Sequence, residues 1–150
     1  MGLHTPFANS ATHAYPAARG LETMPAALAD PLFLAYLHSR FAGANEERLH
    51  VVYCDDKDRY LHDETLIIGD DNFLVLRARP LIHHALAIGA GSIVLAHNHL
   101  SGQCRPSTQD IVATHRLQDL GAAVELTLLD HLIFTRERFF SMAAGGMLHR

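Results

Sequence analysis

The stretch from Ser92 to Asp110, SIVLAHNHLSGQCRPSTQD, constrains the fold and the chemistry of this chain more than any other. It begins with an apolar, β-branched run, Ile93 to Leu95, which predicts a buried strand. A glycine-containing loop follows, and Ser107 is placed to begin a helix. The stretch therefore predicts a strand, a loop and a helix in succession.

Two histidines stand at the end of the predicted strand. His97 and His99 flank Asn98, and alternate residues of a strand project to the same side, so the two imidazoles point together. Asp110, in the first turn of the predicted helix, can face back toward them. Two imidazole nitrogens and one carboxylate, with a fourth position left to water, are the ligand set of a catalytic zinc site. These residues predict that His97, His99 and Asp110 bind Zn²⁺.

Each part of this pattern also has a purely structural interpretation. Ser107 and Asp110 form an S-x-x-D pattern that is typical of a helix capping box. The paired histidines could form a polar rim, since the chain has 12 His in 150 residues. Their combination on one strand, loop and helix favours the metal site. Cys104 lies close in sequence, but a catalytic site keeps its fourth position open, so we expect it not to bind the metal.

The spacing H-x-H-x7-S-x-x-D resembles the JAMM motif of the MPN (JAB1/MPN/Mov34) metallohydrolases. The tripeptide HNH, a following Ser-Gly and the later LLDH are most similar to the RadC branch, over roughly residues 31–142. The resemblance implies an α/β fold, with a mixed β-sheet flanked by helices in a cytidine-deaminase-like sandwich. It also implies a zinc-dependent hydrolase acting on a peptide or a ubiquitin-like conjugate. The chain departs from the branch at Leu100, where RadC-like chains usually have proline.

The same resemblance suggests a general base. The family has a glutamate upstream of its His-x-His, on a strand that borders the metal, and the stretch E-T-L-I-I-G makes Glu64 the candidate here. Glu46 and Glu47, before the preceding strand, are the alternatives. Taken alone, Glu64 would be an exposed carboxylate on an edge strand. Ser107 is the second catalytic candidate, because its hydroxyl could donate a hydrogen bond to a developing oxyanion.

The rest of the chain predicts one domain. Residues 1–28 are rich in Ala, Pro, His and Thr without apolar periodicity, so we expect a flexible tail before a single domain over residues 29–150. Asp30 is the expected N-cap of a helix that starts at Pro31. Helices are also predicted over 80–88 and 107–120, and strands over 48–54, 60–68, 123–129, 132–135 and 138–142. This order predicts a mixed sheet with flanking helices.

Four other polar residues, two histidines on a predicted helix and an Asp-His pair between apolar segments, are predicted to lie outside the ligand set. His83 and His84, on the predicted helix over 80–88, are expected to be exposed or packed rather than metal-binding. Asp130 and His131 separate two apolar segments. Either Asp130 supports His131 or a metal ligand through a hydrogen bond, or the pair forms a surface turn.

Composition limits the partners. The net charge is −4 with neutral His, and no block of Lys or Arg occurs, so strong nucleic-acid binding is not expected. No apolar run approaches membrane-spanning length, and the two cysteines, Cys54 and Cys104, form no disulfide framework. A cytoplasmic protein without membrane association is therefore expected. The oligomeric state does not follow from the sequence.

Two other functions stay open at this point. One is a DNA-repair role of the RadC type, as a nuclease or another DNA-processing protein; in HNH nucleases, however, those letters are spread over a hairpin and a helix. The other is an MPN scaffold that binds a partner, a role that would not require a complete ligand set.

Overall fold

The computed structural model describes residues 30–68 and 73–149. The predicted tail over residues 1–28 lies outside this part. The elements are α2 (Pro31–Ser39), β1 (Arg48–Cys54), β2 (Tyr60–Ile67), α3 (Phe73–Ala87), β3 (Ser92–Asn98), α4 (Thr108–Ala123), β4 (Thr127–Phe134) and β5 (Phe139–Ser141). No helix in this part of the chain is both long and apolar enough to cross a membrane.

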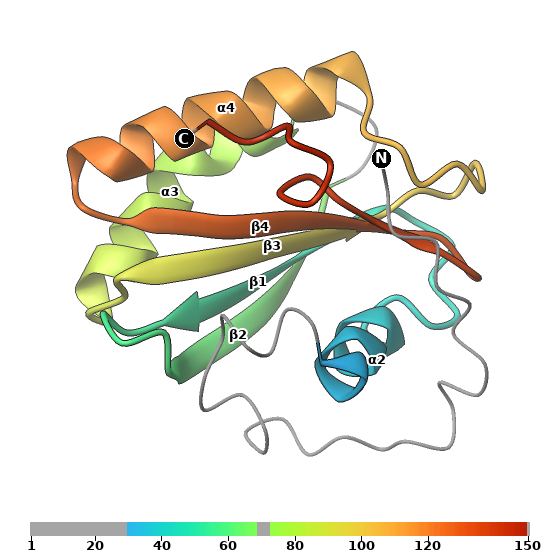
Figure 1. The fold of residues 1–150 in the computed structure, drawn as a ribbon, viewed down its shortest axis with the longest axis horizontal. Helices are drawn as coiled ribbons and strands as arrows, with labels where there is room; N and C mark the ends of the chain where they lie inside the picture. The colour runs from blue at the N-terminus through green and yellow to red at the C-terminus, as the bar shows by residue number, and fades with distance from the viewer. Residues whose placement is uncertain (1–29, 69–72, 150) are drawn as a thin grey trace.

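The strands form one mixed sheet in the order β2-β1-β3-β4-β5 (Figure 1). Strand β1 is antiparallel to β2 and β3, β3 is parallel to β4, and β4 is antiparallel to β5. Helix α2 lies on one face, and α3 and α4 lie on the other. This arrangement confirms the predicted α/β sandwich with a mixed sheet flanked by helices.

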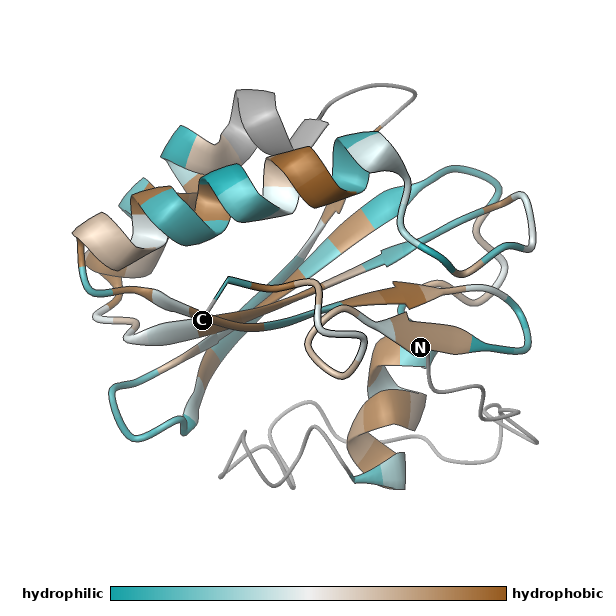
Figure 2. Cartoon of the chain, turned by 45° about the horizontal axis from the view of Figure 1, so that its top comes forward, coloured by the Kyte–Doolittle hydropathy of each residue, from teal (hydrophilic) through white to brown (hydrophobic). Residues whose placement is uncertain are grey.

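Strands β1 and β3 are buried on both faces because their alternate residues enter two separate cores. Val52 and Val94 pack with α2, whereas Val51 and Leu95 pack with α3 and α4. Hydrophobic residues accordingly follow the middle of the sheet and α2, while α4 alternates hydrophilic and hydrophobic turns (Figure 2). The apolar run of β3 is thus a fully enclosed strand, which fixes the direction of every polar side chain at its end.

Helix α2 begins as predicted, with Asp30 Oδ1 accepting a hydrogen bond from the Leu32 amide at 2.9 Å. Helix α3 does not, because it begins at Phe73 and contains Pro80 in its interior. The segment before Pro80 is rich in Leu, Arg and Ala, which favour helix. Pro80 is exposed, and the helix continues through this residue, which was predicted to start it, despite the hydrogen bond that proline cannot donate.

Helix α4 and strand β4 also differ from the prediction. Helix α4 runs through Gly121, which is buried, and an added Cβ there would lie 2.7 Å from the carbonyl oxygen of Leu126. This glycine allows a close approach of two backbones and does not end the helix. Strand β4 is continuous through Asp130 and His131, both buried, so the surface-turn interpretation is wrong.

Candidate metal centre

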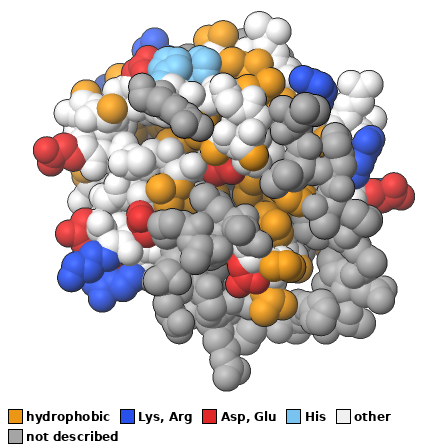
Figure 3. Space-filling view, in the orientation of Figure 1, with side chains coloured by type: hydrophobic (Ala, Val, Ile, Leu, Met, Phe, Trp, Pro, Cys, Tyr) orange, Lys and Arg blue, Asp and Glu red, His pale blue; other side chains and the backbone are white. Residues whose placement is uncertain are grey.

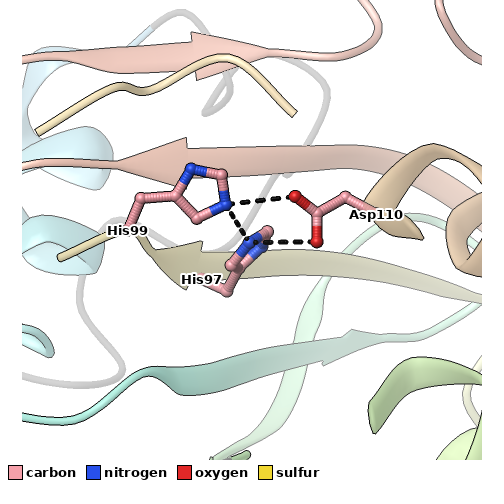
Figure 4. A group of neighbouring side chains, drawn as sticks. All are labelled: His97, His99 and Asp110. Carbon is pink, nitrogen blue, oxygen red and sulfur yellow. Dashed lines mark hydrogen bonds and ion pairs between the residues drawn. The ribbon is translucent and has the colours of Figure 1, made fainter. Parts of the chain in front are cut away.

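The end of strand β3 and the first turn of α4 bring His97, His99 and Asp110 together (Figure 4). Within residues 30–68 and 73–149, they form the one group of three or more His, Cys, Asp or Glu side chains whose ligand atoms converge, all within 4.8 Å of one another. Each position follows from local structure: His97 projects from β3 toward the α4 side, His99 follows the strand, and Asp110 lies in the helix's first turn. The three predicted ligands therefore meet at one point.

The distances within this group fit a tetrahedral metal ion. The Nε2 atoms of His97 and His99 are 2.9 Å apart, Asp110 Oδ2 is 3.0 Å from His99 Nε2, and Asp110 Oδ1 is 3.5 Å from His97 Nε2. Zinc binds such ligands at about 2.0–2.2 Å, which places tetrahedral neighbours roughly 3.3 Å from each other. The three separations lie around this value, so the residues fit the ion that the resemblance implies.

The hydrogen bond made by His99 Nδ1 determines which ring nitrogen carries the proton. His99 Nδ1 lies 2.8 Å from the carbonyl oxygen of Gln103. A carbonyl only accepts, so Nδ1 carries the proton and Nε2 presents a lone pair in the neutral ring. Burial acts to lower the pKa of His99, but its bonds to Asp110 and Gln103, with the charges of Asp110 and Glu47, raise that pKa above its ordinary value.

Asp110 has a structural bond in addition to its place in the group. Its Oδ2 accepts from the Ser107 amide at 2.8 Å, and its own amide donates to Ser107 Oγ at 3.0 Å, so the predicted capping box is present. Burial acts to raise the pKa of Asp110, but its contacts with His97 and His99, together with the hydrogen bond from the Ser107 amide, hold it far below its ordinary value. The capping and metal-site interpretations of this pattern are therefore compatible, because one carboxylate serves both.

A series of buried, hydrogen-bonded polar side chains lies behind His97. His97 Nδ1 is 2.7 Å from His131 Nε2, and His131 Nδ1 is 2.7 Å from Thr114 Oγ1. The sequence did not predict that Thr114 and His131 would lie in contact with each other and with His97. The strand, loop, helix, strand order is consistent with a parallel β4 beside β3, but only the register between these strands shows which residue of β4 comes next to His97.

Asp130 has a different task from its neighbour. Its carboxylate accepts from the His131 amide at 2.7 Å, from Ser141 Oγ at 2.5 Å and from the Ala143 amide at 2.9 Å. These bonds hold the chain that follows β5. The His131 ring contacts the predicted ligand His97, whereas Asp130 contacts His131 only through its backbone amide.

Glu64 lies away from the converging group. It pairs with Val51 of β1, which in turn pairs with Leu95 of β3, so a whole strand separates Glu64 from β3. Its Oε1 accepts from the Tyr53 hydroxyl at 2.6 Å and lies 3.2 Å from His84 Nδ1. The structure does not bring this predicted base beside His97, His99 and Asp110.

Glu47 lies closer to the group than Glu64. Leu49 of β1 is the partner of His97 at the end of the paired register, and Glu47 lies two residues before Leu49, on the side of His99. The charge of Glu47 accordingly acts on the pKa of His99. Of the two alternatives before β1, Glu46 instead pairs with Arg48 at 2.9 Å.

Asn98 fixes the backbone on both sides of Glu47. Its Oδ1 accepts from the Arg48 amide at 2.7 Å, and its Nδ2 donates to the Glu46 carbonyl at 3.1 Å. Asn98 points to the face opposite His97, as strand alternation requires. The middle residue of His-Asn-His thus ties the start of β1 to the end of β3.

A pocket of about 310 Å³ opens beside His99. Apolar side chains from the turn after α2 and from the loop after β3 form part of its wall, and the β4–β5 turn contributes charged residues. Its lining includes Phe41, Ala44, Leu100, Arg136 and Arg138. Leu100, which replaces the usual proline, is 53% exposed and belongs to this pocket wall.

The remaining candidate ligands lie elsewhere. Cys104 is buried among Ile133, Phe140 and Met142, outside the converging group. His83 is exposed and His84 contacts the Tyr53 ring, as expected for residues that do not bind the metal.

A mixed sheet with helices on both faces, and a His-x-His pair meeting an aspartate at the end of a central strand, defines an α/β domain of the JAB/MPN type. The chain belongs to the RadC-like JAB domain family, because the model of that family matches residues 30–147.

Curated relatives carry the name UPF0758 protein. One from Staphylococcus carnosus is 32% identical over 111 residues, covering 74% of this chain and 49% of the relative. One from Latilactobacillus sakei is 37% identical over 107 residues, covering 71% of this chain and 48% of the relative. The chain therefore spans about half the length of the curated relatives it matches.

Proposed function

We propose that this domain is a zinc-dependent hydrolase of peptide or isopeptide bonds. The observation that carries the proposal is the convergence of His97 Nε2, His99 Nε2 and the Asp110 carboxylate at tetrahedral spacing. Zinc held by these three residues would act as a Lewis acid toward a carbonyl and allow water to ionise near neutral pH.

The chain's own residues supply the proton transfers in this proposal. The Glu47 carboxylate, whose charge acts on His99, takes a proton from the attacking water and passes it to the leaving nitrogen. Glu47 replaces Glu64 in this role because Glu64 is engaged by Tyr53 and His84 beyond β1. The two hydrogen bonds between the Asn98 side chain and the backbone of Arg48 and Glu46 hold Glu47 in place.

Ser107 and the pocket beside His99 act on the substrate. Ser107 Oγ accepts a bond from the Asp110 amide, so its own proton can be donated to an oxyanion. The pocket wall of Phe41, Ala44 and Leu100 offers an apolar surface to the substrate next to the reacting bond.

The test is to load the protein with zinc and offer it peptides, ubiquitin-like conjugates, and single- and double-stranded DNA. We expect about one zinc per chain by elemental analysis, and cleavage of a peptide or isopeptide bond that His99→Ala abolishes together with metal binding. Zinc well below one equivalent, unrestored by added metal, would contradict the proposal. Nuclease activity lost in His97→Ala would instead support the DNA-processing alternative, and stoichiometric zinc without any cleavage would support a scaffold.

A further inference from the structure

A continuous series of buried polar contacts runs from α4 to the metal-facing histidine. The Thr114 hydroxyl donates to the Asp110 carbonyl at 2.6 Å, Thr114 Oγ1 lies 2.7 Å from His131 Nδ1, and His131 Nε2 lies 2.7 Å from His97 Nδ1. Thr114 and His131 are both 0% exposed, and His97 is 3% exposed. Bulk water therefore does not compete for these bonds.

The direction of every bond in this series follows from its first member. A carbonyl oxygen only accepts, so the single hydroxyl proton of Thr114 is used on Asp110. Thr114 Oγ1 must then accept from His131, which places the proton of the neutral His131 ring on Nδ1. His131 Nε2 has a lone pair, so His97 Nδ1 donates to it.

We propose that Thr114 and His131 are positioning residues that fix the tautomer of His97 with its Nε2 lone pair toward His99 and Asp110. An unconstrained histidine in water favours the opposite tautomer, whose Nε2 proton would occupy the direction needed for a metal bond. Both histidines of the pair then present lone pairs, His99 through Gln103 and His97 through this series. The inference rests on the proposed metal role of the site.

Helix α4 supplies two parts of the centre one turn apart. Asp110 contributes the carboxylate, and Thr114, four residues later, contributes the hydroxyl that begins the series. The placement of both on one helix face keeps the carboxylate and the tautomer of His97 in a fixed relation.

Valine and serine substitutions of Thr114 separate this role from packing. Thr114→Val keeps the shape and removes the hydroxyl, whereas Thr114→Ser keeps the hydroxyl and removes a methyl group. We expect Thr114→Val to weaken zinc binding by roughly 10- to 100-fold, as is usual for loss of a partner behind a ligand, and Thr114→Ser to stay near wild type. A packing role predicts the reverse order.

Thr65→Val is the matched control. Thr65 Oγ1 also lies 2.7 Å from a histidine Nδ1, that of His50. This contact is on the opposite face of the sheet from Thr114. Zinc affinity, measured by competition with a chelator, should not change in this variant.

The second measurement needs no variant, activity or bound metal. Two-bond ¹⁵N–¹H correlation spectra of the metal-free wild type should show the proton of His97 on Nδ1, and Thr114→Val should populate the Nε2 form. A wild-type His97 with its proton on Nε2, or a folded Thr114→Val protein with wild-type zinc affinity, would overturn the inference. Absence of hydrolysis would affect only the proposed function, because neither measurement depends on turnover.

Discussion

Individual residues in this site serve more than one neighbour. Asn98 ties the two sides of Glu47 to the end of β3, so the segment that holds the proposed base and the segment that holds the ligands form one unit. Asp110 likewise closes a helix cap while facing two imidazoles. The chemistry of the site therefore depends on backbone positions that these polar side chains fix.

At the scale of single residues, one pair of variants tests which glutamate is the general base. Glu47→Gln keeps the shape but removes the basic carboxylate, so turnover should fall by about 10²- to 10⁴-fold while zinc content is retained. Glu64→Gln should keep near-normal turnover, because Glu64 lies beyond β1. The measurements are kcat/KM and zinc per chain.

Glu46→Gln is the control for that pair, since Glu46 is adjacent in sequence but pairs with Arg48. If Glu64→Gln were inactive while Glu47→Gln remained active, the base assignment made from the sequence would be restored.

At the scale of elements, one carboxylate links α2 to the sheet in addition to the apolar packing between them. Asp63 of β2 accepts from His50 Nε2 at 2.8 Å and from the hydroxyls of Tyr36 and Tyr60. Burial acts to raise the pKa of Asp63, but these three hydrogen bonds hold it well below its ordinary value. The ionised carboxylate thus links α2, β1 and β2.

Asp63→Asn should consequently change the pH dependence of stability. A depressed pKa adds stability above about pH 4, the unfolded value, and this contribution is lost as pH falls below it. We expect the variant to lose about 1–3 kcal/mol of unfolding free energy at pH 7, and less at pH 3. Urea unfolding at both pH values measures this, with Asp56→Asn in the exposed turn as control. An equal loss at both pH values would contradict the ionised link.

The elements also show what the sequence could and could not predict. The proposed ligand set follows from local rules, because strand alternation and a helix's first turn bring His97, His99 and Asp110 together within one short segment. Glu47 could not be placed in this way, since its proximity to His99 depends on the pairing of β1 with β3. His131 was hidden for the same reason: polar residues suggest a turn until their buried partners, distant in sequence, are known.

At the scale of the whole molecule, charge argues against tight DNA binding. The net charge is −4. On the face seen in Figure 3, the described Lys and Arg side chains stand in separate groups and form no continuous band. A surface of this kind neutralises few phosphates at once.

We therefore expect duplex DNA to bind more weakly than about 1 µM at physiological salt, with affinity falling steeply as salt is raised. Fluorescence anisotropy of a labelled duplex across a salt series measures both quantities. Submicromolar binding at physiological salt would contradict this expectation.

If the proposed zinc site is correct, the helix cap that contains Asp110 sets how the ion is taken up and released. Small zinc fingers fold only when metal arrives, so their loading and folding are one event. Here the Ser107 amide already orients the Asp110 carboxylate, so the conformational entropy of this side chain is lost on folding and not on ion binding. Chelator-treated protein should therefore keep the amide hydrogen-exchange protection of α4 and regain zinc without refolding. Loss of that protection in chelator would mean that α4 itself needs the ion. Under the proposed function, a site that is shaped in advance would exchange its zinc while the domain stays folded, so the supply of zinc would switch activity without unfolding the protein.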